Sequence, residues 1–549
     1  MKHALIFCLM LCCLSIAKGQ RQEGKHFVLA FMEHVDYNEN RKKLYLTTRK
    51  KSLVKVRIPA LSWEKELTIN TDDAVQLELP KEVETLDSEK KGNLSVWITA
   101  TEPISVFAHQ FSNARSDAAL IFPIASLGRE YVAVTYNGHF EDDHGHPAEF
   151  LVLATKNNTE VYIHPTARTY RNRGPGRPIT ITLDAGETYQ VQAGHYSSDL
   201  TGSQISANKP VAVFSGNMWT QVPTSCRAPD NLFTQLCPIE SAGKEFVVVP
   251  SSQGAFDIVR IISAGKGTEV FLDGRYTTTL YEGEFWELSL RDNPMHIRTS
   301  RPAQVARYLT GYGCAADGGE SLQSDPSLFM VNHIRQSVQE AVFWAPSQAR
   351  IGVQELDLVV RAADANSVKL DGNTVYDFKP VPGASEFFWA RKRVSLGKHK
   401  LEAGGCGVAA YLSGYGRLES YAFPIGTGFS LLDMQAKGLI PEGGCLTDTF
   451  TFISQIDSSL AETIWNMGDG KEYFQPVARH AYDEPGVYRV SLELHNRCLG
   501  ISDTLWGTVV VTPPLKVNTM SDTMICAGDT LRLRASLTPG AEYAWTGPG

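Results

Sequence analysis

The 549-residue sequence lacks the features of several large protein classes. After residue 19, no apolar run approaches the roughly 20 residues that a membrane-spanning helix needs. A net charge of -8 is too mild to indicate a nucleic-acid-binding protein. The 45 Gly and 27 Pro have no regular period, which excludes collagen, and 43% hydrophobic residues exclude a mostly disordered chain. At roughly 150 residues per domain, the length predicts three or four domains.

Familiar catalytic signatures are also missing. The sequence contains no G-x-S-x-G elbow, no H-E-x-x-H pair, no Walker loop and no dinucleotide fingerprint. Its 60 acidic residues include pairs suited to glycoside hydrolysis, but so many acids carry no information about that chemistry. We therefore predict a protein without catalytic residues, and an extracellular carbohydrate-active enzyme remains the alternative.

Residues 1–19 have the pattern of a secretory signal peptide. A Lys2-His3 start precedes an apolar run from Ala4 to Ala17, and small residues at Ala17 and Gly19 predict cleavage before Gln20. The run is too short for a membrane anchor. We expect a secreted protein that is extracellular or held on the outer cell surface.

Short segments with period-2 alternation predict an all-β fold. Examples are KKLYLTTR, TEVYIHP and YRVSLEL, each bounded by turn residues. Residues 327–343 have some helical character, but the corresponding segments elsewhere are strands, so strand–loop–strand is predicted there.

An internal repeat organises this pattern. Four strand-like segments share one sequence pattern and align roughly every 100 residues on Phe107, Phe214, Tyr308 and Tyr411. A hairpin with a Lys-, Asn- or Gly-rich turn accompanies each copy. Residues from about 24 to 427 are therefore predicted to form about four related, β-sandwich-like units packed as one array.

The segments VFAHQFSNARSDAALIFPIASLGREYVAV, ANKPVAVFSGN and NLFTQLCPIESAGKEFVVVP follow one another in this region. Together they resemble the N-terminal domain of the IgGFc-binding family, known from mucus-associated animal proteins and many bacterial secreted proteins. The resemblance implies a binding region, with boundaries at 20–437. No motif matches an Fc contact residue by residue, so immunoglobulin binding is not carried over.

Residues 445–513 resemble a PKD domain, an Ig-like β-sandwich of extracellular proteins, and the predicted domain spans 438–513. The pattern is W-x-x-G-D-G at 465–470 followed by H-x-Y-x-x-P-G-x-Y-x-V at 480–490, with Asn466-Met467 in place of the usual Asp-Phe. A calcium or ligand site at Asp469 is the alternative. The resemblance implies structural roles for Trp465, Gly468, Asp469, Gly470, Tyr482, Pro485, Gly486 and Tyr488.

Residues 514–549 resemble the opening half of another PKD- or Ig-like module. We expect the chain to continue past Gly549 and to be anchored at a surface through a C-terminal region. The whole arrangement resembles secreted surface proteins of the Bacteroidetes type.

Seven of the ten cysteines lie beyond the signal peptide and are expected to pair in an oxidising compartment. Cysteines that bracket one loop or one domain are the natural partners. Cys526 is left over, with a partner expected beyond Gly549. The predicted disulfides are Cys226–Cys237, Cys314–Cys406 and Cys445–Cys498.

Two loops are candidate sites. The loop at 139–150 could bind zinc or another divalent metal through its histidines and acids, or it could be a solvated acidic loop. The basic loop at 168–177 and the basic hairpin at 41–57 could meet anionic glycans, with Tyr170 stacking on a sugar, or could be solvated surface. The metal candidates are Asp142, Asp143, His144 and His146, and the ligand candidates are Arg168, Tyr170, Arg171 and Arg173.

These patterns predict a secreted or cell-surface protein that acts by binding or adhesion. Its N-terminal array is expected to recognise a glycoprotein, mucin or polysaccharide, with the PKD modules as a spacer. No nucleic-acid partner is expected, and no cofactor besides the possible metal. A structural component of a surface filament or gliding adhesin is the second alternative.

Overall fold

The computed structural model describes residues 23–36, 39–141, 144–171, 174–314, 323–347, 350–428, 438–455, 461–496, 498, 501–514 and 544. The predicted signal peptide at 1–19 and nearly all of the module at 514–549 lie outside these residues. The chain separates into two compact units, residues 1–433 and 434–549.

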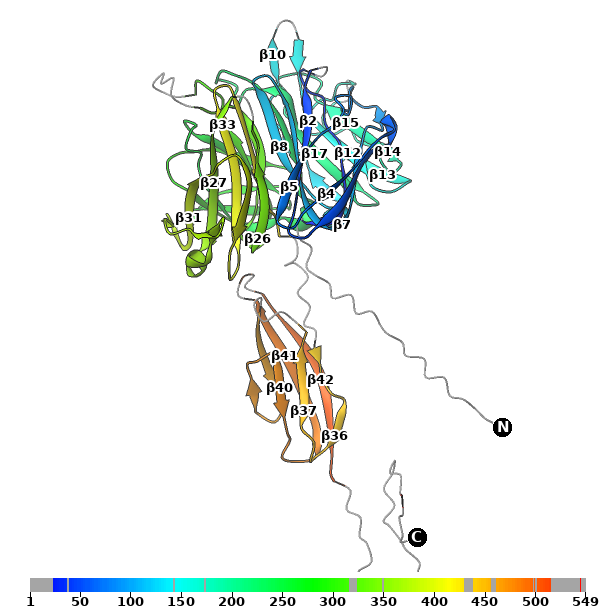
Figure 1. Cartoon of the computed structure of the whole chain (residues 1–549), viewed down its shortest axis with the longest axis vertical. Helices are drawn as coiled ribbons and strands as arrows, with labels where there is room; N and C mark the ends of the chain where they lie inside the picture. Colours follow the sequence, from blue (N-terminus) through cyan, green and yellow to red (C-terminus); the bar gives the residue numbers. More distant parts are fainter. Residues whose placement is uncertain are drawn as a thin grey trace, which may run out of the picture. The chain divides into compact units, whose positions relative to one another are not determined.

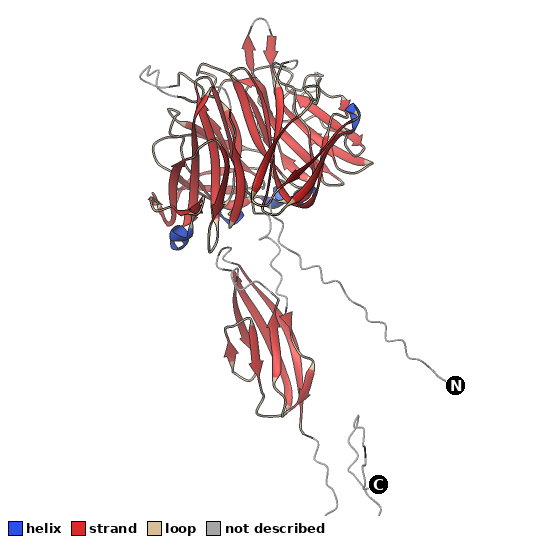
Figure 2. Ribbon diagram, viewed as in Figure 1, coloured by secondary structure: helices blue, strands red, loops and turns tan. Residues whose placement is uncertain are grey.

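Almost every regular element is a strand (Figure 2), which confirms the all-β prediction. Within the described residues, no helix has the length and apolar character needed to cross a membrane. The helical elements are short 3-10 turns: η1 (Pro59–Leu61), η2 (Ile124–Ser126), η3 (Ile239–Ser241), η4 (Ile334–Gln336) and η5 (Ala362–Ser367).

The N-terminal unit consists of four consecutive repeats, coloured from blue to yellow in Figure 1. Repeat 1 contains β1 (Gly24–Leu29), β2 (Arg41–Thr48), β3 (Ser52–Ile58), β4 (Trp63–Ile69), β5 (Asp73–Glu78), β6 (Lys91–Gly92), β7 (Val96–Ser112) and β8 (Arg115–Ile121). Repeat 2 contains β9 (Glu130–Val132), β10 (His139–Glu141), β11 (His144–His146), β12 (Ala148–Ala154), β13 (Thr159–His164), β14 (Ile179–Leu183), β15 (Thr188–Gln192), β16 (Gln204–Ala207), β17 (Val211–Thr220) and β18 (Asp230–Gln235).

Repeat 3 contains β19 (Gly243–Val248), β20 (Asp257–Ser263), β21 (Thr268–Leu272), β22 (Arg275–Leu280), β23 (Phe285–Leu290), β24 (Met295–Leu309) and β25 (Ser327–Val331). Repeat 4 contains β26 (Glu340–Ala345), β27 (Ile351–Arg361), β28 (Lys369–Leu370), β29 (Asn373–Thr374), β30 (Lys379–Val381), β31 (Ala384–Arg393), β32 (Gly397–Glu402), β33 (Val408–Gly416) and β34 (Glu419–Pro424). The strand–loop–strand prediction for 327–343 is confirmed by β25, η4 and β26.

Each repeat is built from two antiparallel layers. In repeat 1 these are β8-β7-β2-β5 and β1-β7-β3-β4, joined because the long β7 runs through both. Pro103 lies within β7 where the strand passes between the layers, and the register of β1 shifts beside it, as expected near a residue that cannot donate a backbone hydrogen bond. Repeat 3 uses β24 in the same way, whereas repeats 2 and 4 divide the equivalent strand into two. The aligned aromatics Phe107, Phe214, Tyr308 and Tyr411 are all buried in the core.

The four repeats close into a ring, which the sequence did not predict. Their last strands are neighbours in a cycle: β8 lies beside β18 and β34, and β25 lies beside the same two strands. Asp117 on β8 ties two of its neighbours, because its carboxylate accepts hydrogen bonds from the backbone N–H of Phe233 (2.9 Å) and of Leu328 (3.0 Å). Radial repetition of this kind protects sheet edges that an open array would expose.

The C-terminal unit is a two-sheet sandwich. Its sheets have the orders β35-β37-β40 and β36-β42-β41-β38-β39. Trp465 is fully buried in its core, and Tyr482 stacks on Tyr488 with ring centroids 4.0 Å apart. The strands are β35 (Gly438–Leu439), β36 (Gly443–Cys445), β37 (Phe450–Ser454), β38 (Glu462–Asn466), β39 (Glu472–Tyr473), β40 (Val477–His480), β41 (Gly486–Asn496) and β42 (Ile501–Thr512).

The Gly-Asp-Gly segment of this sandwich forms a tight turn after β38. Gly468 and Gly470 have φ values of 79° and 91°, a region that side-chain-bearing residues rarely adopt. Between them, Asp469 accepts a hydrogen bond from the backbone N–H of Lys471 (3.0 Å) and lies 2.9 Å from Nε2 of His480. Pro485 and Gly486 lead into β41. Asp469 thus holds the turn against β40.

The predicted disulfide pairing is wrong. Cys226 is bonded to Cys314, while Cys237 and Cys445 are free thiols. Cys226 lies in the loop before β18 and Cys237 lies beyond the far end of that strand, so the two cannot meet. Cys314 follows its long strand, β24, whereas Cys406 precedes the equivalent strand, β33, so these cysteines are at opposite ends.

The third predicted bond fails for a similar reason. Cys445 pairs in register with Thr512 at one end of β42, and Cys498 follows the opposite end of the β41–β42 ladder. Eleven residues of strand at about 3.3 Å each separate those ends, far beyond the roughly 7 Å that a disulfide allows between Cα atoms. Cys406 and Cys498 are both disulfide-bonded.

Candidate recognition surface

The hairpin β10–β11 projects from one end of the N-terminal unit (Figure 1). It pairs His139 with His146 and Phe140 with Gly145. At its foot, His139 and His146 both lie edge-on to the ring of Trp219, with centroids 5.0 and 5.1 Å away. The other side of the hairpin presents Phe140, which is 46% exposed.

Segment 193–198 packs against this hairpin. The ring of Tyr196 lies 4.8 Å from that of Phe140 and 4.3 Å from that of His195, so three mutually tilted rings form a continuous row. The backbone approach is close, because a Cβ on Gly138 would lie 2.1 Å from the carbonyl oxygen of His146. Only glycine therefore permits this contact at position 138.

The basic loop after β13 borders the same segment from the other side. Thr169 pairs with Ala193, and the backbone N–H of Gly194 donates to the carbonyl of Arg168 (2.7 Å). The side chains of Arg168, Tyr170 and Arg171 are exposed, Tyr170 to 67%. Among the described residues, neither of these arginines has an ion-pair partner.

Two loops that are separate in sequence are thus joined through segment 193–198. We call Phe140, His195, Tyr196, Arg168, Tyr170 and Arg171 the aromatic–basic surface. It combines exposed rings, which suit the apolar faces of sugars or peptides, with unpaired guanidinium groups, which suit carboxylate or sulfate. Arg173 lies outside the described residues.

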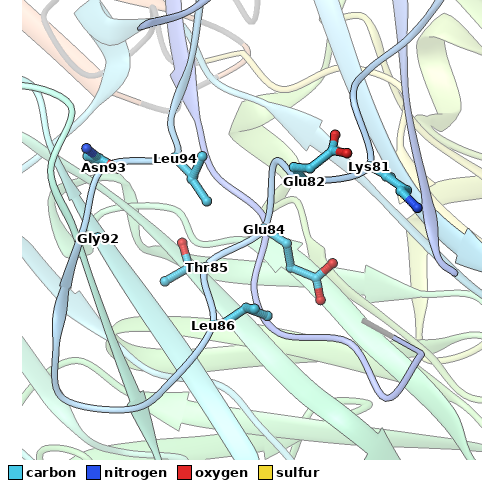
Figure 3. Close-up of a pocket in the computed structure, with 8 residues that line it drawn as sticks. All are labelled: Lys81, Glu82, Glu84, Thr85, Leu86, Gly92, Asn93 and Leu94. Atoms are coloured by element: carbon cyan, nitrogen blue, oxygen red, sulfur yellow. The ribbon is translucent and has the colours of Figure 1, made fainter. Parts of the chain in front are cut away.

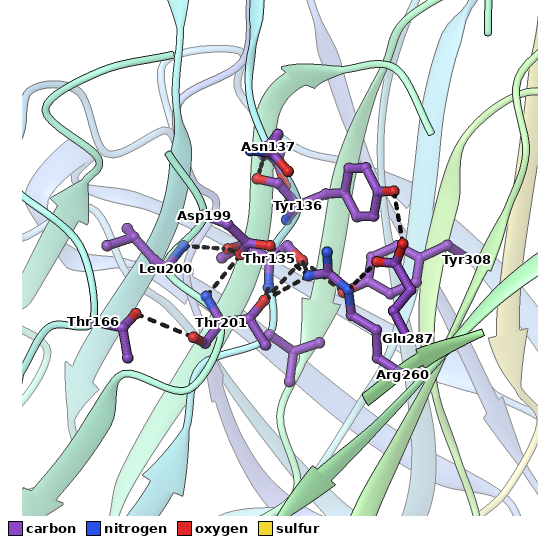
Figure 4. Close-up of polar contacts among 12 residues, drawn as sticks. Thr135, Tyr136, Asn137, Thr166, Asp199, Leu200, Thr201, Arg260, Glu287 and Tyr308 are labelled. Carbon is purple, nitrogen blue, oxygen red and sulfur yellow. Dashed lines mark hydrogen bonds and ion pairs between the residues drawn. The ribbon is translucent and has the colours of Figure 1, made fainter. Parts of the chain in front are cut away.

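Arg260 of repeat 3 binds Asp199 and Thr201, which follow segment 193–198 in the chain (Figure 4). Its guanidinium donates to Oδ2 of Asp199 (2.7 Å), to the carbonyl of Thr135 (2.7 Å) and to Glu287 (2.8 Å). Burial alone would raise the pKa of Asp199, but Arg260 and the hydrogen bonds from Thr135 and Thr201 outweigh it and hold that pKa below its usual value. The residues that follow segment 193–198 are therefore held by an ion pair between repeats 2 and 3, Arg260 with Asp199.

A second buried network supports the surface next to Gln192. Its side-chain amide donates to Glu33 (3.0 Å) and to Oε2 of Glu149 (2.9 Å). Oε1 of Glu149 is buried and has no hydrogen-bond partner among the described residues. Burial raises the pKa of Glu149 well above its usual value, and the charges of Glu33 and Glu84 raise it further.

We expect Glu149→Gln to change how stability depends on pH. Because the folded-state pKa lies above the unfolded value of 4.5, this carboxyl favours folding at low pH, and its contribution is lost as pH rises towards the folded pKa. The loss is up to about 1.4 kcal/mol per pH unit. Glutamine cannot ionise, so the variant should gain Tm relative to wild type at pH 8 but not at pH 5. Thermal unfolding at both pH values measures this, and an equal difference at both would contradict it.

The predicted metal ligands are only partly visible. Asp142 and Asp143 lie outside the described residues, and nothing is described of the His144 side chain. The ring of His146 faces Trp219. The metal at this loop stays a prediction. Within the described part of the chain, Glu245, His296 and Glu386 offer ligand atoms within 4.8 Å of one another.

The basic hairpin at 41–57 is less available for binding an anionic glycan than its sequence indicates. β2 is an interior strand between β7 and β5, so Lys42 is fully buried and pairs with Glu84 at 2.5 Å. Arg49 is held by Glu23 and Glu340, both at 2.6 Å. These cations neutralise neighbouring acids and are not free to meet a glycan.

A pocket of about 370 Å³ lies between β5 and β7, lined by residues 81, 82, 84–86 and 92–94 (Figure 3). Its buried acid, Glu84, is already engaged by Lys42, by Asn40 (2.7 Å) and by the backbone N–H of His34 (2.7 Å). A buried carboxylate that accepts three hydrogen bonds, one of them from a paired lysine, holds a loop and is poorly placed for acid–base chemistry. The pocket therefore gives no support to the enzyme alternative.

Sequence reasoning missed His195, Tyr196 and Trp219. Each is a single aromatic residue in a turn or at a strand end, and no repeat or spacing marks it. The two loops that were found carry local runs of His, acid or Arg, whereas the segment that joins them carries no such run.

Comparison with known proteins agrees with the two-part organisation. A family model described as IgGFc binding protein matches residues 117–414, and a PKD domain model matches residues 433–504. The human IgGFc-binding protein is 27% identical over 391 residues, covering 68% of this chain but 7% of that protein. The chain therefore spans a small part of the length of this relative.

Solved structures overlap only loosely with the chain. The N-terminal four Ig domains of Dscam1 isoform 8.4 are 10% identical with a TM-score of 0.17, covering 66% of this chain and 100% of that one. A structure titled for the host cell surface retention of a bacterial ice-binding adhesin is 11% identical with a TM-score of 0.10, covering 57% and 98%. Because these TM-scores are so low, the superpositions give no information about the ring of four repeats.

Proposed function

The chain belongs to the IgGFc binding protein family through residues 117–414 and carries a PKD domain, and from this membership we propose that it is an extracellular binding or adhesion protein. Its ligand is a glycoprotein or mucin with acidic glycans, bound at the aromatic–basic surface. The PKD unit acts as a spacer for the N-terminal unit.

The row of tilted rings formed by Phe140, Tyr196 and His195, beside unpaired arginines, carries this proposal. Rings held against one another lose little freedom on binding, so the apolar face of a sugar can cover them at low entropic cost. Arg168 and Arg171 add charge-assisted hydrogen bonds to sulfate or carboxylate. Such contacts weaken with salt, because the arginines are exposed.

The test is binding of the full chain to immobilised mucin glycopeptides, sialylated, sulfated or neutral, with IgG Fc included because the relative's name refers to it. We expect acidic glycopeptides to bind and Phe140→Ala/Tyr196→Ala to weaken them roughly 10- to 100-fold, about 1–3 kcal/mol. Arg168→Ala/Arg171→Ala should weaken binding at low salt and flatten its salt dependence.

Tyr376→Ala is the matched control, since this tyrosine of repeat 4 is 82% exposed and lies outside the surface. It should bind as wild type does. Unchanged affinity in the Phe140/Tyr196 variant, or an equal loss of affinity in the Tyr376 variant, would contradict ligand binding at the aromatic–basic surface.

A further inference from the structure

Two acids and a histidine meet where repeat 4 packs on repeat 3. Glu245 lies on β19 and His296 on β24 of repeat 3, and Glu386 lies on β31 of repeat 4. Each offers one ligand atom, and these atoms all lie within 4.8 Å of one another. Within the described residues, no other set of three or more His, Cys, Asp and Glu side chains does so. The three side chains are therefore close enough to share one ion.

Packing between the two repeats brings Glu386 to this place. Its chain neighbour Phe387 is buried in the same hydrophobic cluster as Phe246 of repeat 3. The two repeats also approach closely, because a Cβ on Gly383 would lie 2.9 Å from Cβ of Asp273. The position of Glu386 beside repeat 3 is thus fixed by its neighbours, although its own side chain is exposed.

His296 is held in place by contacts that need no ion. It is 6% exposed, and its ring lies 5.7 Å from that of Phe387. Its backbone N–H donates to Oδ1 of Asp273 (3.0 Å), and its carbonyl accepts from the N–H of Asp273 (2.9 Å). Nε2 of His296 lies 3.1 Å from Oε1 of Glu245. The imidazole is therefore a positioned ligand whose nitrogen already faces one of the two carboxylates.

We propose that a zinc ion binds between Glu245, His296 and Glu386 and joins repeat 3 to repeat 4. One imidazole and two carboxylates suit zinc, whereas calcium and magnesium take oxygen ligands. Around a tetrahedral zinc ion with bonds of about 2.1 Å, ligand atoms lie about 3.4 Å apart, close to the 3.1 Å between Nε2 and Oε1. Rotation of the exposed Glu386 side chain closes the remaining distance, and water fills the fourth position. The proposal goes beyond glycan recognition and does not depend on it.

Two arginines near the site limit its expected affinity. The hydrogen bond from His296 lowers the pKa of Glu245 most, and the charges of Arg361 and Arg298 lower it further. The positive charge that favours the ionised carboxylate also repels a cation. We therefore expect zinc to bind more weakly here than at structural sites with four protein ligands.

The test is zinc binding to the chelator-treated full chain, measured by native mass spectrometry and thermal unfolding. We expect zinc at 100 times its Kd to raise the Tm of the N-terminal unit by about 3 °C. Calcium or magnesium at the same concentration should give no such shift. Glu386→Gln and Glu245→Gln each remove one carboxylate, so each should lose one zinc ion from the mass and abolish the shift that this ion causes. Because Glu386 is exposed, its variant should fold as wild type does.

Asp371→Asn is the matched control. Asp371 lies 2.7 Å from Nδ1 of His399, which is 5% exposed, but no third donor joins this pair within the described residues. The control should keep the zinc ion and the Tm shift. An ion bound at the loop 139–150 would persist in all three variants, so the difference in mass between them and wild type identifies the proposed site.

A wild-type chain that takes up no zinc would overturn the proposal. So would a zinc ion and a Tm shift that survive in both glutamine variants or disappear in Asp371→Asn. An equal shift with calcium would contradict a site built around an imidazole.

Discussion

Arg260→Met is expected to destabilise the N-terminal unit by roughly 3–5 kcal/mol, because it leaves Asp199 and Glu287 as uncompensated acids. The guanidinium is 3% exposed and lies between the rings of Tyr136 and Phe285, each 4.4 Å from its central carbon. Methionine fills much of the volume but supplies none of the hydrogen bonds. For about 400 residues this corresponds to a fall in Tm of about 5 °C.

The same variant should weaken ligand binding, since Asp199 holds segment 193–201 in place. Arg291→Met is the matched control: Arg291 also lies over a phenylalanine, Phe256, at 4.4 Å, but it is exposed, and among the described residues its guanidinium bonds only to the carbonyl of Ala255. The control should cost less than about 1 kcal/mol. Equal melting temperatures for the two variants would show that the buried ionic contact does not hold the repeats together.

Loss of the Cys226–Cys314 bond is expected to have an effect of similar size. The bond closes a segment of 88 residues, and restricting an unfolded chain over that length is worth about 4–5 kcal/mol. It also holds the loop before β18 against Gly311, whose N–H donates to the carbonyl of Val222 (2.9 Å). Cys226→Ser/Cys314→Ser should therefore lower Tm by about 5 °C under non-reducing conditions.

The variant Cys237→Ala distinguishes the Cys226–Cys314 bond from the Cys226–Cys237 bond that was predicted from the sequence. Cys237 is buried and free, so removing its sulfur should cost only the small amount expected for a trimmed core side chain. Thiol titration of the denatured chain should detect Cys237 in wild type. A fall in Tm for Cys237→Ala as large as that of the double variant would contradict the Cys226–Cys314 bond.

Local sequence patterns were sufficient for much of the fold. Period-2 alternation predicted the strands, and the aligned aromatics at 107, 214, 308 and 411 predicted four repeats, because both signals arise within one repeat. Ring closure depends on contacts between β8, β18, β25 and β34, which no pattern within a repeat encodes. The cysteine pairing failed for the same reason, since it depends on which strand ends meet in space.

The candidate surface was found in part for similar reasons. Loops 139–150 and 168–177 carry dense runs of His, acid or Arg, which are visible in the sequence. Tyr196 became visible only when the fold placed it between them. The buried state of Asp230 and Asp325 was hidden as well, because both have ordinary neighbours in the sequence and become unusual only through burial.

The most direct test of the account is the footprint of a bound acidic mucin glycopeptide on the full chain, measured by hydrogen–deuterium exchange. The account predicts protection at residues 136–149, 165–171 and 193–198, with exchange at the pocket of residues 81, 82, 84–86 and 92–94 and in the PKD unit unchanged. Protection confined to that pocket or to the PKD unit, with the three segments unaffected, would contradict recognition at the aromatic–basic surface.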